Sequence, residues 1–138
     1  MIFVDSNLFV YAVGRTHPLR PQAQQFFVNA VQKNQRLVTS AEVLQELLHI
    51  YIPVNRFETL DHALELALQT TEEVLPISAE TVTYARMLTD EHPSLSARDL
   101  LHLATCQLND VREIKTFDRN LSAAFRKKFG GQKQPPAK

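Results

Sequence analysis

The sequence predicts an α/β protein, a three-layer α/β/α sandwich around a central parallel sheet. Short apolar or β-branched runs alternate with segments in which apolar residues recur at helical spacing. Most of these runs are followed at once by Ser, Asn or Asp, which are favoured at a helix N-terminus. Strands that alternate with helices pair in parallel through right-handed crossovers, which places helices on both faces of the sheet.

The first half of the chain is expected to contain two strands and three helices. The run before Asp5 forms the first strand. Pro18 and Pro21 open a helix, because proline is tolerated in a first helical turn, and Pro53 stops another. The expected elements are a strand at 2–4, a helix from 18 to 34, a strand at 36–39, a helix from 40 to 51 and a helix at 57–71.

The second half continues the alternation. Pro76 cannot donate to a ladder, so the strand that contains it is expected at an edge of the sheet. Ser78 and Thr81 have the spacing of a helix N-terminus, and Ser96 opens a further helix after Pro93. The expected elements are a strand at 74–77, a helix from 78 to 91, a helix from 96, a strand at 113–116 and a short helix from 118 or 120.

Composition is that of an ordinary globular protein: 44% of the residues are apolar and 22% are charged, with zero net charge. A net charge of zero argues against a protein that binds nucleic acid through electrostatic attraction alone. The single Cys106 excludes an intramolecular disulfide and a cysteine-based zinc site. No apolar stretch approaches the ~20 residues of a membrane span, and no leader pattern is present, so we expect a cytoplasmic protein without membrane contact.

The length predicts a single domain, which we place at 1–130. Residues 131–138 form a basic, proline-containing segment with Lys133 and Lys138 and no acidic residue. Two interpretations of this segment stay open. It is either a solvated, disordered tail or an arm that contacts the backbone of a polyanion.

Four acidic residues stand where expected strands and helices meet: Asp5, Glu46, Asp99 and Asp118. The carboxyl ends of parallel strands lie at one edge of a sheet, where ligands bind. Carboxylates gathered there repel by about 1 kcal/mol per pair at about 4 Å in water, and by roughly 4 kcal/mol at an effective dielectric of 20. A divalent cation between them offsets this repulsion, and the pattern therefore favours a metal site.

Three of these carboxylates also have structural interpretations. Asp5 can stabilise a turn, and Asp118 can cap the last helix. Asp99 fits a capping box with Ser96, a role that is compatible with pointing across the sheet edge.

Glu42 competes with Glu46, since both lie on the helix from 40 to 51. At about 100° per residue, Glu46 lies roughly 115° from the centre of the apolar face and Glu42 roughly 155°. We therefore expect Glu46 beside the core and Glu42 in solvent. The same projection puts His49 and His102 on the solvent side of their helices, so neither is expected to act in a site.

The chain resembles the PIN-domain ribonucleases, in particular the small VapC-type toxins of prokaryotic toxin–antitoxin pairs. The resemblance extends to about residue 127 and rests on four short motifs that occur in order. They are Val4-Asp5-Ser6-Asn7, Thr39-Ser40 followed by Val43-Leu44 and Glu46, Asp99 followed by His102-Leu103-Ala104, and Thr116-Phe117-Asp118.

This resemblance implies a divalent-metal-dependent endoribonuclease whose catalytic residues are Asp5, Glu46, Asp99 and Asp118. Asn7 and Thr116 would support them. It also implies strand order 3-2-1-4, to which a short fifth strand can be added, a homodimer, and a cognate antitoxin protein that blocks the site. A PIN-like domain that binds RNA or a partner without cutting remains an alternative.

The expected cofactor is Mg²⁺ or Mn²⁺, because these ions prefer oxygen ligands. We expect Asp5 and Asp99 to be the main ligands, with weaker contributions from Asp118 and Glu46. Glu46 would also hold or deprotonate the water that attacks the RNA phosphodiester. Contacts to RNA phosphates are expected from three neighbouring cations, for which plain surface exposure is the competing explanation: Arg98, Lys115 and Arg119.

Two other α/β classes have acidic pockets but fit the residues less well. Phosphatases of the haloacid-dehalogenase type need a second aspartate two residues after the nucleophile, where this chain has Asn7. Receiver domains of two-component signalling need an aspartate after the strand at 74–77, where the chain has Ile77 and Ser78.

Overall fold

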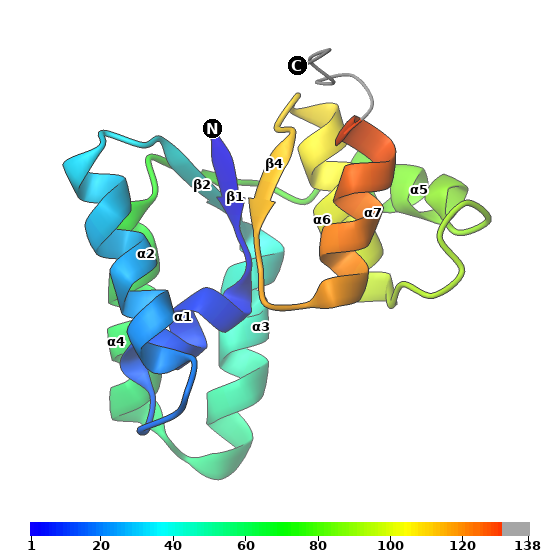
Figure 1. Ribbon diagram of the computed structural model, residues 1–138. Helices are drawn as coiled ribbons and strands as arrows, with labels where there is room; N and C mark the ends of the chain where they lie inside the picture. Colours follow the sequence, from blue (N-terminus) through cyan, green and yellow to red (C-terminus); the bar gives the residue numbers. More distant parts are fainter. Residues whose placement is uncertain (131–138) are drawn as a thin grey trace.

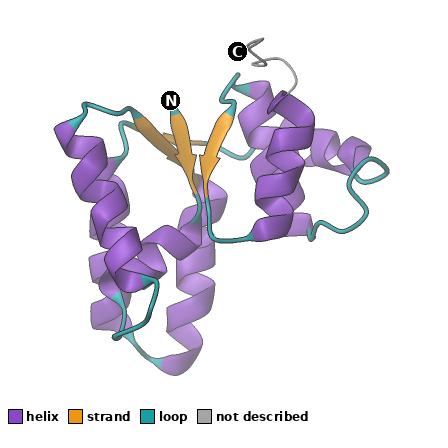
Figure 2. Ribbon diagram, in the orientation of Figure 1, coloured by secondary structure: helices purple, strands orange, loops and turns teal. Residues whose placement is uncertain are grey.

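The computed structural model of the protein describes residues 1–130 and confirms the α/β/α class. Figure 2 distinguishes the strands, the helices and the loops that join them. The strands are β1 (Ile2–Val4), β2 (Leu37–Ser40), β3 (Glu73–Leu75) and β4 (Glu113–Lys115). The helices are α1 (Ser6–Val13), α2 (Arg20–Gln32), α3 (Ala41–Tyr51), the 3-10 helix η1 (Ile52–Val54), α4 (Phe57–Thr70), α5 (Ala79–Leu88), α6 (Ala97–Leu108) and α7 (Arg119–Phe129).

The strands form one parallel sheet in the order β3-β2-β1-β4, as expected. Phe3 of the central β1 pairs with Val38 on one side and Ile114 on the other. β3 lies at an edge, and it ends at Leu75, directly before Pro76. Within residues 1–130 the sheet has four strands, without the short fifth strand, and the predicted tail at 131–138 lies outside the described residues.

The helices form two groups on either side of the sheet (Figure 1). α1, α2 and α4 pack together in one group, and α5, α6 and α7 form the other. α3 joins the groups, because it contacts α1 and α4 as well as α6. This contact between α3 and α6 brings distant parts of the sequence together at the carboxyl edge of the sheet.

The clearest addition to the expected elements is α1, which begins directly after β1. Asp5 caps it, accepting a hydrogen bond on Oδ1 from the Ser6 amide at 2.7 Å. The sequence of this segment does not predict a helix, because it is apolar on nearly all sides and lacks a polar face. Its contacts with α2, α3 and α4 explain this composition.

Several helix boundaries differ from the expected ones by a few residues. α2 begins at Arg20, with Pro21 rather than Pro18 in its first turn. α5 ends at Leu88, before the expected 91, and its capping box between Ser78 and Thr81 confirms the predicted start. Helix ends are the part of an element that sequence specifies least, because fraying and tight turns compete there.

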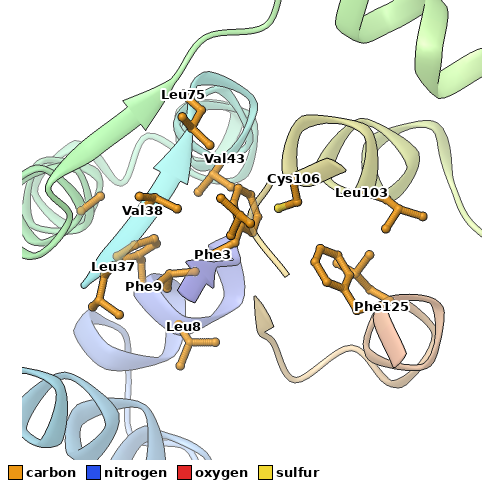
Figure 3. Packing of buried hydrophobic residues seen from close by; sticks show 14 of the residues in the cluster. Phe3, Leu8, Phe9, Leu37, Val38, Val43, Leu75, Leu103, Cys106 and Phe125 are labelled. Carbon is orange, nitrogen blue, oxygen red and sulfur yellow. The ribbon is translucent and has the colours of Figure 1, made fainter. Parts of the chain in front are cut away.

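The core surrounds β1 and β2 and extends into both helical groups. Figure 3 shows Phe3 among side chains from strands and helices, with Cys106, Leu103 and Phe125 nearby. Cys106 is buried and free, as expected for a small core residue. No helix in the described part of the chain is long and apolar enough to span a membrane.

Phe9 on α1 offers a direct test of this packing. Its side chain is 0% exposed and stacks on Phe27 with ring centroids 5.4 Å apart. We expect Phe9→Ala to lower the free energy of unfolding by about 3–5 kcal/mol in urea titrations, because it removes apolar contacts and leaves a cavity. Val31→Ala is the control, since Val31 is 72% exposed and its truncation should change stability by only about 0.5 kcal/mol. Equal effects of the two substitutions would contradict the packing.

Candidate active site

The four predicted acidic residues line one pocket of about 490 Å³ at the carboxyl edge of the sheet. Asp5 follows β1, Glu46 lies on α3, Asp99 is in the first turn of α6, and Asp118 precedes α7. Asp5, Glu46 and Asp118 converge because β1, β2 and β4 run in parallel and the segment after each strand emerges at the same edge. The expectation that a strand also precedes Asp99 was wrong: α6 follows α5, and its contact with α3 brings Asp99 to this edge. The pocket thus collects carboxylates from four separate parts of the chain.

Asp5 is the most enclosed of these acids and is only 4% exposed. The Thr116 hydroxyl donates to Asp5 Oδ2 at 2.7 Å. Asn7 Nδ2 lies 3.4 Å from the same oxygen and 3.2 Å from Thr116 Oγ1. Burial raises the pKa of Asp5, although His102 and Thr116 act to lower it. The two predicted supporting residues, Asn7 and Thr116, therefore contact this carboxylate and fix its orientation.

Asp118 has the capping role that the sequence suggested, Asp99 shows only the Ser96 half of its expected capping box within residues 1–130, and both acids line the pocket. Asp118 Oδ1 accepts from the amides of Asn120 and Leu121 at 2.9 and 3.1 Å, which caps α7. The Asp99 amide donates to Ser96 Oγ at 3.2 Å at the start of α6. Burial and then the charges of Asp118 and Asp5 raise the pKa of Asp99. Repulsion between these acids thus adds to the effect of burial on the pKa of Asp99.

Glu46 lies beside the core, as expected, but Glu42 does not face solvent. The two side chains are 15% and 19% exposed, and Arg98 of α6 contacts both. Arg98 Nη1 lies 3.3 Å from Glu46 Oε2, and Arg98 Nε lies 3.7 Å from Glu42 Oε2. The prediction for Glu42 was wrong because a helical projection of α3 does not include α6, which packs across it.

The exposure predicted for His102 was also wrong: this side chain is 1% exposed and lies inside the site. Its Nε2 is 3.5 Å from Asp5 Oδ1 and 3.6 Å from Glu46 Oε1. The projection failed because α6 contacts α3, α5 and α7 and so has more than one buried side. The sequence does contain a signal for the position of His102. It lies three residues after Asp99, so the two side chains are neighbours on one helix and His102 is expected near the same pocket. His49 is exposed, as expected.

The imidazole and the two carboxylates shift one another's pKa values. Burial acts to lower the pKa of His102, but Glu46, Asp5 and Asp99 outweigh it and raise the pKa. Burial acts to raise the pKa of Glu46, but His102 and Arg98 bring it below its usual value. One ligand atom from each of Asp5, Glu46 and His102 lies within 4.8 Å of the others, a separation that a metal ion can bridge.

The three predicted phosphate contacts lie in different surroundings. Arg98 lines the acidic pocket and is held by the two glutamates. The Lys115 ammonium lies over aromatic rings, 5.8 Å from the centroid of Phe26 and 6.0 Å from that of Phe117. Arg119 is exposed and lines an adjoining hollow of about 210 Å³, which shares Asp118 with the acidic pocket.

Comparison with known proteins is consistent with this geometry. Residues 2–127 match the PIN domain family. The chain is 56% identical over 126 residues to Ribonuclease VapC23 of Mycobacterium tuberculosis, covering 91% of this chain and 99% of that protein. It is 40% identical over 123 residues to Ribonuclease VapC13 of the same species, covering 89% and 94%.

Two solved structures share the fold at low sequence identity. Mycobacterium tuberculosis VapC20, described as a sarcin–ricin loop cleaving toxin, superposes with a TM-score of 0.75 at 19% identity, covering 90% of this chain and 95% of that chain. VapBC2 from Rickettsia felis, bound to a DNA fragment from its promoter, gives a TM-score of 0.62 at 21% identity, with coverages of 86% and 88%. The match to the PIN family decides against the phosphatase and receiver classes. The chain belongs to the PIN-domain family, and within it to the VapC ribonucleases.

Proposed function

We propose that the protein is a metal-dependent endoribonuclease and the toxin of a toxin–antitoxin pair, with residues 1–130 as its single catalytic domain. The observation that carries the proposal is the convergence of four carboxylates on one pocket. Relatives at 56% and 40% identity that are named ribonucleases support the same activity.

The residues of the pocket fit a divalent ion. Glu46 Oε1 is buried and has no hydrogen-bond partner within residues 1–130. The pKa of Asp99 is raised by burial and by its acidic neighbours, so a cation there would relieve an unfavourable interaction. An oxygen-rich set favours Mg²⁺ or Mn²⁺ over metals that prefer sulfur. We assign Asp5 and Asp99 as the main ligands, with Asp118 and Glu46 as weaker ones.

When bound, the ion supplies a Lewis acid for the phosphodiester and lowers the pKa of water. Glu46, whose pKa lies below its usual value, is ionised at neutral pH and can accept a proton from the attacking water. Thr116 and Asn7 hold the Asp5 carboxylate in one orientation. The amides that bind Asp118 Oδ1 orient that carboxylate in the same way.

We also propose a homodimer and a cognate antitoxin as partners. A VapBC pair is present in the Rickettsia felis structure that shares this fold. Light scattering during size-exclusion chromatography would measure the mass of the purified protein directly. We expect a small antitoxin protein encoded directly upstream of the gene, and its co-expression should yield a complex that no longer cuts RNA.

Contacts to RNA phosphates are assigned first to Arg119 and, in addition, to Arg126. Both line the hollow beside Asp118, and neither has an acidic partner within residues 1–130. They lie seven residues apart on α7, a rise of about 10.5 Å along one face of the helix. Arg98 is less suited, because Glu42 and Glu46 already neutralise it.

Cleavage of a pool of structured RNAs, including a sarcin–ricin loop hairpin, tests the activity. We expect discrete products with Mg²⁺ or Mn²⁺ and none with EDTA. Asp5→Asn should lower the rate by about a hundredfold or more, because it removes a main ligand. Asp61→Asn, at an exposed position on α4, is the matched control and should cut normally. Equal cutting by the protein and its Asp5 variant would refute the proposal. A protein that cuts no RNA and also shows no rise in melting temperature with Mn²⁺ would refute it as well.

The same Asp5 variant makes a prediction about stability. Because folding raises the pKa of Asp5, the stability associated with its protonated form is lost as pH rises through the folded pKa. Above that pKa the neutral Asn avoids the cost of a buried charge, so the melting temperature at pH 7 without metal should be unchanged or higher. A large fall in melting temperature would instead assign Asp5 a structural role.

Binding measurements separate the two arginines from other cations on α7. In the Asp5→Asn background, Arg119→Gln and Arg126→Gln should each weaken binding of a fluorescent single-stranded RNA and reduce its salt slope by about 0.7. Lys127→Gln and Lys128→Gln remove the same charge from the same helix, but these lysines contact Glu91. Their slopes should change less. Equal changes in all four variants would indicate only a general charge effect.

A further inference from the structure

We infer that His102 is a positioning residue that sets the separation and orientation of the Asp5 and Glu46 carboxylates, and thereby the affinity of the site for its metal ion. The inference rests on the proposed function and adds a residue that the acidic quartet does not include. It concerns the geometry of the ligands, and it does not make His102 a catalytic residue.

His102 lies between the carboxylates of Asp5 and Glu46. Its Nε2 lies 3.5 Å from Asp5 Oδ1 and 3.6 Å from Glu46 Oε1. The other oxygen of each carboxylate is oriented by a different group. Thr116 donates to Asp5 Oδ2 at 2.7 Å, and Arg98 lies 3.3 Å from Glu46 Oε2. Asp5 Oδ1 also accepts a hydrogen bond from the Ser6 amide at 2.7 Å, whereas Glu46 Oε1 has no hydrogen-bond partner within residues 1–130. His102 Nε2 is therefore the group that fixes Glu46 Oε1 relative to Asp5.

The imidazole itself is buried and packed against an aromatic ring. It is 1% exposed, and its ring lies 5.4 Å from that of Phe3 at an interplanar angle of 47°. Neither ring nitrogen has a hydrogen-bond partner within residues 1–130, so Nε2 acts through its proximity to the two acids and Nδ1 makes no polar contact. A buried polar group without a hydrogen bond is costly, and its retention here is explained by its position between two negative charges.

Without this group, the two carboxylates would repel each other across a poorly solvated gap. Asp5 is confined by its short side chain, by the Ser6 amide on Oδ1, and by Thr116 and Asn7 at Oδ2. Glu46 has a longer side chain, and Arg98 would be its remaining counter-charge. We therefore expect Glu46 to rotate toward Arg98 when Nε2 is removed, away from the position in which it can serve the ion and the attacking water.

Two variants distinguish Nε2 from the rest of the ring. His102→Gln places an amide near the position of Nε2, whereas His102→Asn places one near that of Nδ1, and both remove the aromatic contact with Phe3. The readout is the affinity of the protein for Mn²⁺ without RNA, measured by electron paramagnetic resonance. His102→Asn should weaken Mn²⁺ binding by about 10–100-fold, the range typical of residues that orient metal ligands, and His102→Gln should restore it to within a few-fold of the parent protein.

Phe3→Leu serves as the control for packing, since it removes the same ring contact and leaves His102 in place. It should lower the melting temperature without changing Mn²⁺ affinity. Equal losses of Mn²⁺ affinity in His102→Asn and His102→Gln would overturn the inference, as would normal affinity in His102→Asn or a comparable loss in Phe3→Leu. If Asp5→Asn itself leaves Mn²⁺ binding unchanged, the proposed function fails before the role of His102 is in question.

Discussion

The repulsion among acidic side chains at one edge of the sheet is the constraint on which the rest of the site depends. Asp5, Glu46, Asp99 and Asp118 line the same pocket, and the pKa of Asp99 is raised partly by the charges of Asp118 and Asp5. Such a group persists in a folded protein only when nearby donors and cations offset its cost. The residues around the pocket supply these donors and cations.

Helix α6 provides most of the compensation from a single element. Its first two turns carry Arg98, Asp99 and His102, which are a cation, an acid and an imidazole. Because α6 packs between α5, α7 and α3, these side chains project into the protein at more than one angle. Arg98 and His102 thus reach Glu46 on α3, and the contact between the two helices becomes an electrostatic connection as well as an apolar one.

The structural and functional interpretations of the other acids turn out to be complementary. Asp5 caps α1, Asp118 caps α7, and Ser96 caps α6 by accepting from the amide of Asp99. A backbone amide that binds one oxygen of a carboxylate also fixes the direction of the other oxygen. Helix capping therefore helps to orient the carboxylates of Asp5 and Asp118, two of the side chains that we assign to the metal.

Local sequence was sufficient to place the strands, the order of most helices and the four acidic positions, because these depend on periodicity and on residues at strand ends. It was not sufficient for His102, Glu42 or α1. Each of these was misjudged or missed because its environment depends on several helices at once, whereas a helical projection assumes one buried face. Only the packing of α3 against α6 decided that His102 lies between Asp5 and Glu46, since that contact joins segments far apart in the chain.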